Sequence, residues 1–318
     1  MRAIRVGLLG CGVVGGGFVE LLHRNRARIG ERYGVDLEVS KILVRDLEKE
    51  RPFVDRALLT TSAESVIRNG CDLVVELIGG TQPARRLIRD AIGAGKHVVT
   101  ANKCVLATDG LDLLELAAIH RVRVGFEASV CGAIPIIRVL RGGLSGDRVE
   151  SVEGILNGTS NYILTRMAEG GVDFNEALGE AQRNGFAEAE PSLDVDGVDA
   201  AQKLKILAEL AFGRPLSLND VDVEGVGGVT AETIARASRR GEVIKLVARA
   251  VKTEDDILLR VAPTSIPLDH PLARVRNEFN GVLLRSEAAG EMMFVGPGAG
   301  SLPSASAVLA DVIELASM

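Results

Sequence analysis

A short aliphatic run that leads directly into closely spaced glycines constrains the fold more than any other feature of this chain. The run 4–9 is predicted to be a buried strand, and the glycines follow it in the order Gly10-Cys11-Gly12-Val13-Val14-Gly15. Apolar residues at 18, 21 and 22 then supply one face of a helix. A strand, a glycine-rich turn and a helix in this order begin a βαβ unit, so we expect an α/β fold.

The alternation of aliphatic runs and helical stretches continues through the first third of the chain. Further strands are expected at 37–44, 73–78, 97–100 and 122–126, and helices at 84–94 and 111–120. Sequential strands joined by helices lie parallel in one sheet. Residues 1–140 are therefore predicted to form a Rossmann-type, doubly wound parallel sheet.

Residues 141–295 have a different pattern. A long polar loop precedes a helix expected over 200–211, and strand-like runs follow at 243–251, 257–261, 281–286 and 292–295. This pattern predicts an α+β domain with an open antiparallel or mixed sheet, which would bind the substrate and form a dimer. In the tail 296–318 we expect a helix capped by Ser304 or Ser306 that folds back to complete the first domain.

Composition excludes several classes of partner. The 37 basic and 43 acidic residues give a formal charge of −6 without a basic stripe, so nucleic acid is not expected. No stretch approaches the roughly 20 apolar residues of a membrane span. The four cysteines lack CxxC spacing and clustered histidines, which predicts free thiols rather than a zinc site. We expect a cytoplasmic protein.

The glycine-rich turn predicts a dinucleotide site. Gly10 permits the tight turn, Gly12 lets the backbone approach a pyrophosphate, and Gly15 lets the helix pack on the strand. The free N–H groups at the helix N-terminus would bind the anion. At the tip of the second strand, Arg45 favours the 2′-phosphate of NADP, with Lys49 or Arg51 as possible helpers, whereas the neighbouring Asp46 keeps NAD as an alternative.

A dense run of carboxylates precedes one lysine between residues 185 and 203. The carboxylates are Glu188, Glu190, Asp194, Asp196 and Asp199, and the lysine is Lys203. Asp199 and Lys203 are four apart on an expected helix, so they share a face and could form a simple surface ion pair. An amino-acid substrate offers a different explanation, because carboxylates bind its ammonium and a lysine can move the proton that accompanies hydride transfer. Lys103 is a second such lysine, at the carboxyl end of a predicted parallel strand.

Six blocks of sequence together resemble the homoserine dehydrogenase family along nearly the whole chain. They are GxGxVG at 10–15, TANK at 100–103, EASVxGxIPII at 127–137, NGTxNYIL at 157–164, the segment 185–203, and GPGAGxxPSASAVLAD at 296–311. The resemblance implies an NADP- or NAD-dependent oxidoreductase that interconverts L-homoserine and L-aspartate 4-semialdehyde in threonine, methionine and isoleucine biosynthesis. It also implies a homodimer.

The resemblance assigns roles residue by residue. It makes Lys203 the leading acid/base group and Lys103 a second lysine near the transferred hydride, beside the cofactor. Its substrate-binding residues are Glu188, Asp194, Asp199, Gly158 and Thr159. Its cofactor residues are Gly10, Cys11, Gly12, Val13, Val14, Gly15, Arg45, Lys103 and Gly300. A sodium ion would be held by Glu127, Val130, Gly132 and Ile134.

Departures from the family pattern concern the loop after residue 127 and the end of the sequence. Cys131 and Ala133 stand where relatives usually have glycine, and Glu190 replaces the commoner aspartate. Because the sequence ends at Met318, we expect a short form without the C-terminal ACT regulatory domain that many relatives carry.

Two other functions compete with this one. Aspartate-semialdehyde dehydrogenase handles the same aldehyde but requires an activated cysteine, for which Cys131 is the candidate. An NADP-binding sensor would keep the fold without catalysis. The combination of Lys103, Glu188, Asp194, Asp199 and Lys203 argues against a sensor.

Overall fold

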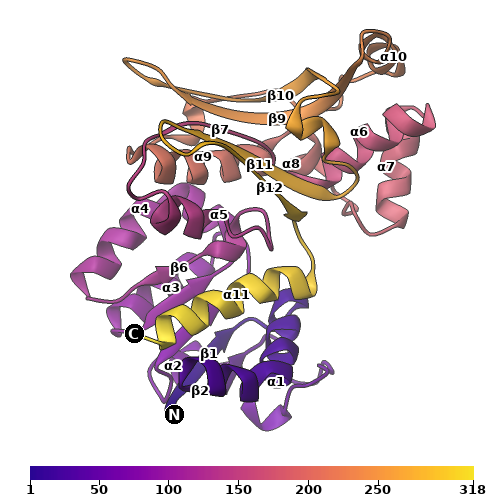
Figure 1. Ribbon diagram of the computed structural model, residues 1–318. Coiled ribbons are helices and arrows are strands. Elements are labelled where there is room, and N and C mark those ends of the chain that lie inside the picture. Colours follow the sequence, from indigo (N-terminus) through magenta and orange to yellow (C-terminus); the bar gives the residue numbers. More distant parts are fainter. The chain divides into compact units, whose positions relative to one another are not determined.

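The computed structural model describes residues 1–318 and divides into two compact units (Figure 1). The first unit comprises Met1–Ala133 and Ala299–Met318, and the second comprises Ile134–Gly298. The segment 134–140, which the sequence pattern assigned to the first domain, thus belongs to the second unit. The short helix α5 (Ile136–Arg138) runs into the π-helical turn η3 (Val139–Gly143), which packs on α9 (Val198–Phe212) of that unit.

The first unit is built on a parallel sheet in the order β3-β2-β1-β4-β5-β6. Its strands are β1 (Arg2–Leu9), β2 (Val35–Leu43), β3 (Leu59–Thr60), β4 (Leu73–Glu76), β5 (His97–Thr100) and β6 (Val124–Gly125). Its connecting helices are α1 (Val13–Tyr33), α2 (Ala63–Ile67), α3 (Ala84–Gly93) and α4 (Lys103–Ile119). The Rossmann-type prediction is confirmed. The strand order reverses between β1 and β4, which is where open α/β sheets bind ligands.

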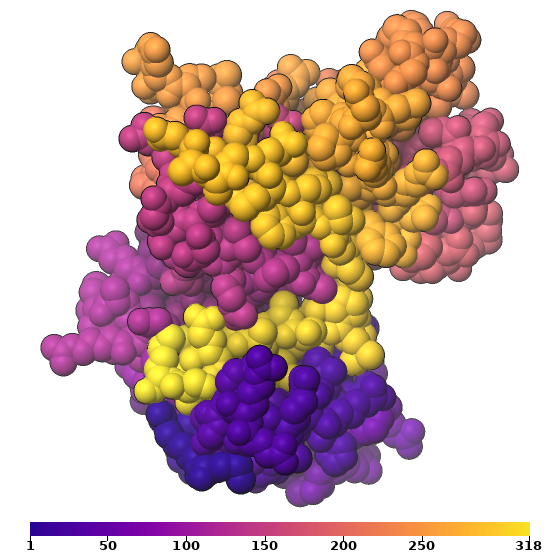
Figure 2. Space-filling model, viewed as in Figure 1, coloured from indigo at the N-terminus to yellow at the C-terminus, as the bar shows by residue number.

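The C-terminal helix α11 (Ser301–Ala316) belongs to the first unit and packs along α1. Figure 2 shows this yellow segment against the indigo N-terminal residues. A Cβ on Gly17 would lie 2.5 Å from Ser301 Oγ, so the absence of a side chain at Gly17 allows the approach. The expected cap at Ser304 or Ser306 is wrong: the helix begins a turn earlier, behind Gly300. Pro303 does not prevent this start, because the backbone N–H that proline lacks would have no intrahelical partner in the first turn of a helix.

The second unit contains a mixed sheet in the order β12-β11-β7-β9-β10-β8. Its strands are β7 (Val149–Ile155), β8 (Val221–Val223), β9 (Glu242–Lys252), β10 (Ile257–Pro267), β11 (Phe279–Ser286) and β12 (Gly290–Pro297). All neighbours are antiparallel except β10 and β8. The mixed-sheet prediction is confirmed, although β7 and β8 were missed. Charged residues interrupt both strands and leave no continuous aliphatic run to give a clear strand signal.

The predicted helix at 200–211 corresponds to α9, and it contacts the sheet together with α6 (Gly158–Gly170). The expected polar loop before α9 is wrong, because it contains α7 (Phe174–Arg183) and the short α8 (Ser192–Val195). Asp173 caps α7 by accepting from Glu176 N at 2.9 Å, and two alanines form its buried face. A further helix, α10 (Ala231–Arg239), precedes β9. No helix of the chain is long and apolar enough to cross a membrane.

Candidate active site

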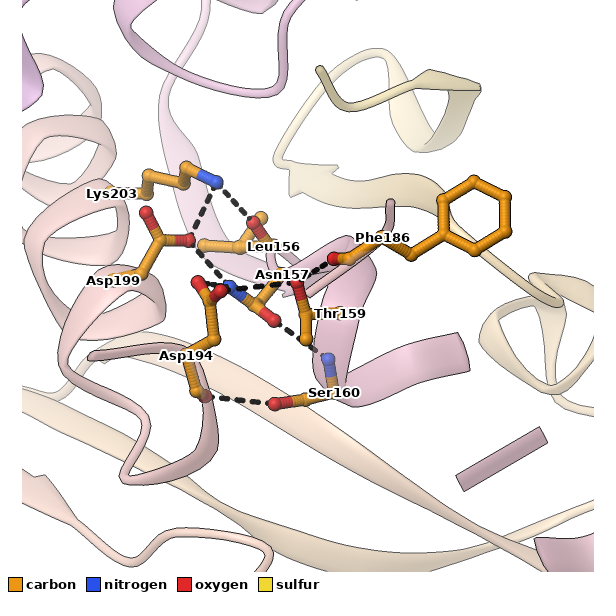
Figure 3. Close-up of polar contacts among 8 residues, drawn as sticks. All are labelled: Leu156, Asn157, Thr159, Ser160, Phe186, Asp194, Asp199 and Lys203. Carbon is orange, nitrogen blue, oxygen red and sulfur yellow. Dashed lines mark hydrogen bonds and ion pairs between the residues drawn. The ribbon is translucent and has the colours of Figure 1, made fainter. Parts of the chain in front are cut away.

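Asn157 stands at the junction of β7 and α6 and joins two carboxylates. Its Oδ1 accepts from Ser160 N at 2.8 Å and thereby caps α6, while its Nδ2 donates to Asp194 Oδ1 at 2.7 Å and to Asp199 Oδ2 at 2.8 Å (Figure 3). The side chain is 4% exposed. One amide thus both starts the helix and holds two acidic side chains from α8 and α9 beside it.

Lys203 and Asp199 lie one helical turn apart near the start of α9. Lys203 Nζ donates to Asp199 Oδ2 at 2.7 Å and to the main-chain oxygen of Leu156 at 2.7 Å. The lysine and aspartate side chains are 11% and 6% exposed, so this is a buried pair. The prediction that the two residues share a face is confirmed. The alternative of a surface ion pair is wrong, because both side chains are buried. An ammonium has three N–H groups, and two of them point to these acceptors.

The first turn of α6 fixes the segment that carries Asp194. Ser160 Oγ donates to the main-chain oxygen of Asp194 at 2.8 Å. The Thr159 hydroxyl donates to Phe186 O at 2.6 Å and lies 3.1 Å from Asp194 Oδ2. A Cβ on Gly158 would lie 2.6 Å from the main-chain oxygen of Glu278, so the chain passes too closely there for a side chain.

The structure brings together Lys203, Asp199, Asp194 and Thr159, all of which the sequence singled out. Glu188 does not join them, because its side chain is exposed. Its main-chain oxygen accepts from Gln182 Nε2 at 3.2 Å. Two network residues, Asn157 and Ser160, were missed as site residues. A signal exists in the residue type, because asparagine is a preferred N-cap, but no helix was expected after Asn157.

The glycine turn of the first unit has the geometry that a dinucleotide requires. Gly10 has φ 95°, and a Cβ there would lie 2.8 Å from Leu77 O. A Cβ on Gly15 would lie 2.5 Å from Gly10 O. Nothing lies within 4 Å of the Cβ position of Gly12, and no side chain caps the N-terminus of α1. The first peptide N–H groups of α1 are thus open to an anion, and Cys11, Val13 and Val14 lie on this turn.

Two other segments lie near this turn. Ser301 Oγ donates to Val13 O at 2.9 Å, which places the adjacent Gly300 by the start of α1. Arg51 Nε donates to Cys11 O at 3.4 Å. Arg45 is exposed just beyond β2, whereas the carboxylate of Asp46 accepts from Glu48 N at 2.8 Å within its own turn.

Lys103 is the first residue of α4, directly after β5 and the N-cap Asn102. It therefore lies at the carboxyl end of the parallel sheet, where such sheets present ligand-binding groups.

The loop from Glu127 to Gly132 combines a buried carboxylate with a tight backbone turn. Glu127 is buried, and its N–H donates to Asp311 Oδ2 of α11 at 2.8 Å. Cys131 and Gly132 both adopt left-handed conformations, with φ 55° and 54°. The cysteine thus takes the backbone conformation that glycine adopts without strain. The Cys131 side chain is 1% exposed, which disfavours it as an attacking thiol.

Comparison with known proteins agrees with this geometry. The profile of the homoserine dehydrogenase family matches residues 135–313, and that of the homoserine dehydrogenase NAD-binding domain matches residues 10–127. The chain is 45% identical to homoserine dehydrogenase from Bacillus subtilis over 317 residues, which are 99% of this chain and 73% of that protein.

Solved structures show the same relationship. The crystal structure of a homoserine dehydrogenase from Thiobacillus denitrificans is similar with a TM-score of 0.97 and 45% identity, over 100% of this chain and 74% of that one. A hyperthermophilic archaeal homoserine dehydrogenase mutant in complex with NADPH is similar with a TM-score of 0.83 and 27% identity, over 98% and 97% of the two chains. The chain therefore belongs to the homoserine dehydrogenase family, and it is an oxidoreductase with a nicotinamide-nucleotide-binding domain.

Proposed function

We propose that this chain interconverts L-homoserine and L-aspartate 4-semialdehyde with NADP or NAD, in the biosynthesis of threonine, methionine and isoleucine. The observation that carries the proposal is the buried network in which Asn157 and Lys203 hold Asp194 and Asp199 in the second unit. Both substrates carry an ammonium, which carboxylates bind, and an oxygen that gains or loses a proton, which a lysine can serve.

Lys203 is the acid/base group in this proposal. In the reducing direction its ammonium donates the N–H that neither Asp199 nor Leu156 occupies to the carbonyl oxygen of the semialdehyde. When bound at the glycine turn, a nicotinamide cofactor would supply the hydride in this direction and accept it in the other. In the oxidising direction Lys203 takes the hydroxyl proton of homoserine, and the contact with Asp199 orients the amine of Lys203. Lys103 acts as a second lysine near the reacting atoms.

The acidic residues around Lys203 bind and orient the amino acid. Asp194 and Asp199 attract its ammonium, and Thr159 holds Asp194 in place. Gly158 lets the first turn of α6 pass close to the main chain of Glu278. Glu188 is exposed and contributes a carboxylate to the same substrate. Fixed geometry of this kind lowers the entropic cost of bringing the reacting groups together.

The cofactor is held by the glycine turn, with Gly300 beside it. NADP is preferred, because the Arg45 guanidinium is exposed at the tip of β2 while the Asp46 carboxylate is engaged in its own turn. Arg51, which contacts Cys11 O, adds a second positive charge near the same turn.

A sodium ion fits the residues assigned to it. Glu127 supplies one carboxylate, and Val130, Gly132 and Ile134 supply main-chain oxygens, so the donor set contains only the hard oxygen ligands that such a cation takes. No group of three His, Cys, Asp or Glu side chains in the chain is arranged to hold a metal ion. A higher melting temperature in NaCl than in choline chloride at equal ionic strength supports this site, and equal values contradict it.

A homodimer and a cytoplasmic location complete the proposal. On β9, Ala248 and Ala250 are buried, whereas Arg249 and Val251 line a groove of about 870 Å³ on the other face of the sheet. We expect this face to pair with a second copy of the chain, which the molar mass measured by light scattering tests directly.

The matched pair Lys203→Met and Lys205→Met tests the catalytic assignment. Lys205 forms an equally buried i,i+4 pair with Glu209 on the same helix, at 2.7 Å. Each variant leaves one buried carboxylate without its lysine and is expected to lose about 3–5 kcal/mol of stability. Turnover of homoserine at a temperature where both variants are folded should fall at least about a hundredfold in Lys203→Met alone. Equal activities in the two variants would remove Lys203 from the mechanism.

The same assay separates an enzyme from a sensor. NADPH binding, followed by its fluorescence, should persist in Lys203→Met, because the residue lies in the second unit and the glycine turn in the first. A wild-type protein that binds NADPH but turns over neither homoserine nor the semialdehyde would favour the sensor.

A further inference from the structure

Glu76 is a fully buried carboxylate that none of the roles above uses. It ends β4 and is 0% exposed. Its Oε1 accepts from Ile78 N at 2.7 Å and from Gly79 N at 3.3 Å, and its Oε2 accepts from the Thr100 hydroxyl at 2.6 Å. Burial of a carboxylate is costly, and these three neutral donors offset that cost. Such an arrangement holds the loop after β4 to the end of β5.

The contacts continue from Thr100 to the start of α4. The oxygen of its hydroxyl accepts from Asn102 N at 3.0 Å. Asn102 Oδ1 then caps α4 by accepting from Val105 N at 3.2 Å, and its Nδ2 donates to Gly80 O at 2.8 Å. Lys103 therefore lies directly after a residue whose main-chain N–H donates to Thr100, the partner of Glu76, and whose side chain donates to the loop 77–80.

The loop after β4 also packs against the glycine turn. Leu77 N donates to Leu9 O at 2.8 Å. The Cβ position of Gly10 lies 2.8 Å from Leu77 O and 3.0 Å from Ile78 N. Because β1, β4 and β5 are neighbours in the sheet, Glu76 stands between the turn that binds the pyrophosphate and the loop that carries Lys103. This is the edge of the sheet where the strand order reverses, at which open α/β sheets bind ligands.

We propose that Glu76 is a positioning residue for the oxidoreductase reaction. Its carboxylate fixes the 77–80 loop and the 100–103 loop relative to each other, and so sets the nicotinamide end of the cofactor against Lys103. The inference rests on the proposed function. An ionised carboxylate suits this place because both of its oxygens only accept hydrogen bonds. A glutamine would have to turn its NH₂ group toward either the two peptide N–H groups or Thr100. In the second case the Thr100 oxygen accepts from both the amide and Asn102 N, and the Thr100 O–H loses its carboxylate acceptor.

The test compares Glu76→Gln, Thr100→Val and Thr100→Ser with the wild-type enzyme. Thr100→Val removes the contact between the loops and Glu76→Gln replaces its charged acceptor, whereas Thr100→Ser keeps the hydroxyl. Small misplacements of about 1 Å cost up to about a hundredfold in rate. We therefore expect kcat to fall roughly tenfold to a hundredfold in Glu76→Gln and Thr100→Val, with KM for homoserine changed less than about threefold. Thr100→Ser should stay within about threefold of wild type in kcat.

Two readouts distinguish positioning from a loss of stability. With homoserine deuterated at C4, the isotope effect on kcat should rise in Glu76→Gln, because hydride transfer becomes slower relative to the other steps. Asp109→Asn is the control: this carboxylate is also buried in the first unit, but it pairs with Arg85 and Thr108 on α3 and α4. It should lower the melting temperature and leave the isotope effect unchanged.

An unchanged kcat and isotope effect in Glu76→Gln and Thr100→Val would overturn the inference while leaving the proposed function intact. If the wild-type enzyme turns over neither substrate, the proposed function fails, and the inference is judged on bound NADPH alone. Its fluorescence emission should then differ between wild type and Thr100→Val and agree between wild type and Thr100→Ser. Identical emission in all three proteins would refute the positioning role.

Discussion

Replacement of Asn157 by aspartate should destabilise the protein strongly although it changes a single atom of the side chain. The carboxylate keeps an oxygen for Ser160 N, so α6 remains capped. The lost NH₂ group, however, donates to Asp194 and Asp199 at 2.7 and 2.8 Å. The new side chain instead directs an oxygen at two carboxylates, so it removes two hydrogen bonds and adds charge repulsion.

The magnitude follows from these contacts. A hydrogen bond to a charged group contributes about 1.5–3 kcal/mol, and Asp194 is only half-buried, which lowers its share. We expect Asn157→Asp to lose about 3–5 kcal/mol at pH 8, a large part of the roughly 5–15 kcal/mol that stabilises a typical domain. Asn157→Ser keeps the cap without the added charge and should lose about 1–3 kcal/mol.

The assay is urea unfolding of each variant at pH 8. The control is Asn25→Asp, where the amide donates to the neutral Leu21 O at 2.8 Å and the expected loss is about 1 kcal/mol. If Asn157→Asp were as stable as Asn25→Asp, the bridging role of Asn157 would be refuted.

Three further predictions concern other parts of the chain. Burial lowers the pKa of Lys245 from 10.5 to about 8, and its ammonium donates to Asn161 Oδ1 and Val275 O. Between these two pKa values the unfolded lysine binds more protons than the folded one. In urea unfolding, the stability of wild type relative to Lys245→Met should therefore rise by about 2 kcal/mol from pH 7 to pH 9.5. In thermal unfolding, the free energy of unfolding of Cys131→Gly should stay within about 1 kcal/mol of wild type. Cys131→Val places a β-branched residue at φ 55° and should lose more than about 1 kcal/mol. A valine variant more stable than the glycine variant would contradict the strain at this position. In steady-state assays, Arg45→Ala should lower kcat/KM for NADP about tenfold and change kcat/KM for NAD less than about threefold. An equal loss with both cofactors would argue against a contact with the 2′-phosphate.

The parallel sheet could be predicted from the sequence because its central strands, β4, β5 and the second half of β1, are buried on both faces. Such strands are continuous aliphatic runs, and the glycines of 10–15 mark the first turn without ambiguity. Charged residues interrupt the strands β7 and β8, so neither contains a continuous aliphatic run. The early start of α11 was missed because its N-cap is Gly300, which has no side chain to signal a helix start.

In the candidate site, local spacing predicted what lies within one helix. Asp199 and Lys203 are four residues apart, and periodicity alone places them together. The contact of Asn157 with Asp194 joins residues 37 apart in the sequence, and that of Glu76 with Thr100 joins residues 24 apart. Neither follows from a periodic pattern, because each depends on how separate elements pack. Sequence therefore identified the charged residues of the site but not the amide that holds them.

Oxidation of L-homoserine and reduction of L-aspartate 4-semialdehyde by this protein are tested most directly by absorbance at 340 nm. Purified protein is run with homoserine and NADP or NAD, and then in reverse with the semialdehyde and the reduced cofactor. We expect turnover in both directions, with the higher kcat/KM for NADP. Cofactor binding without any change in absorbance in either direction would contradict it.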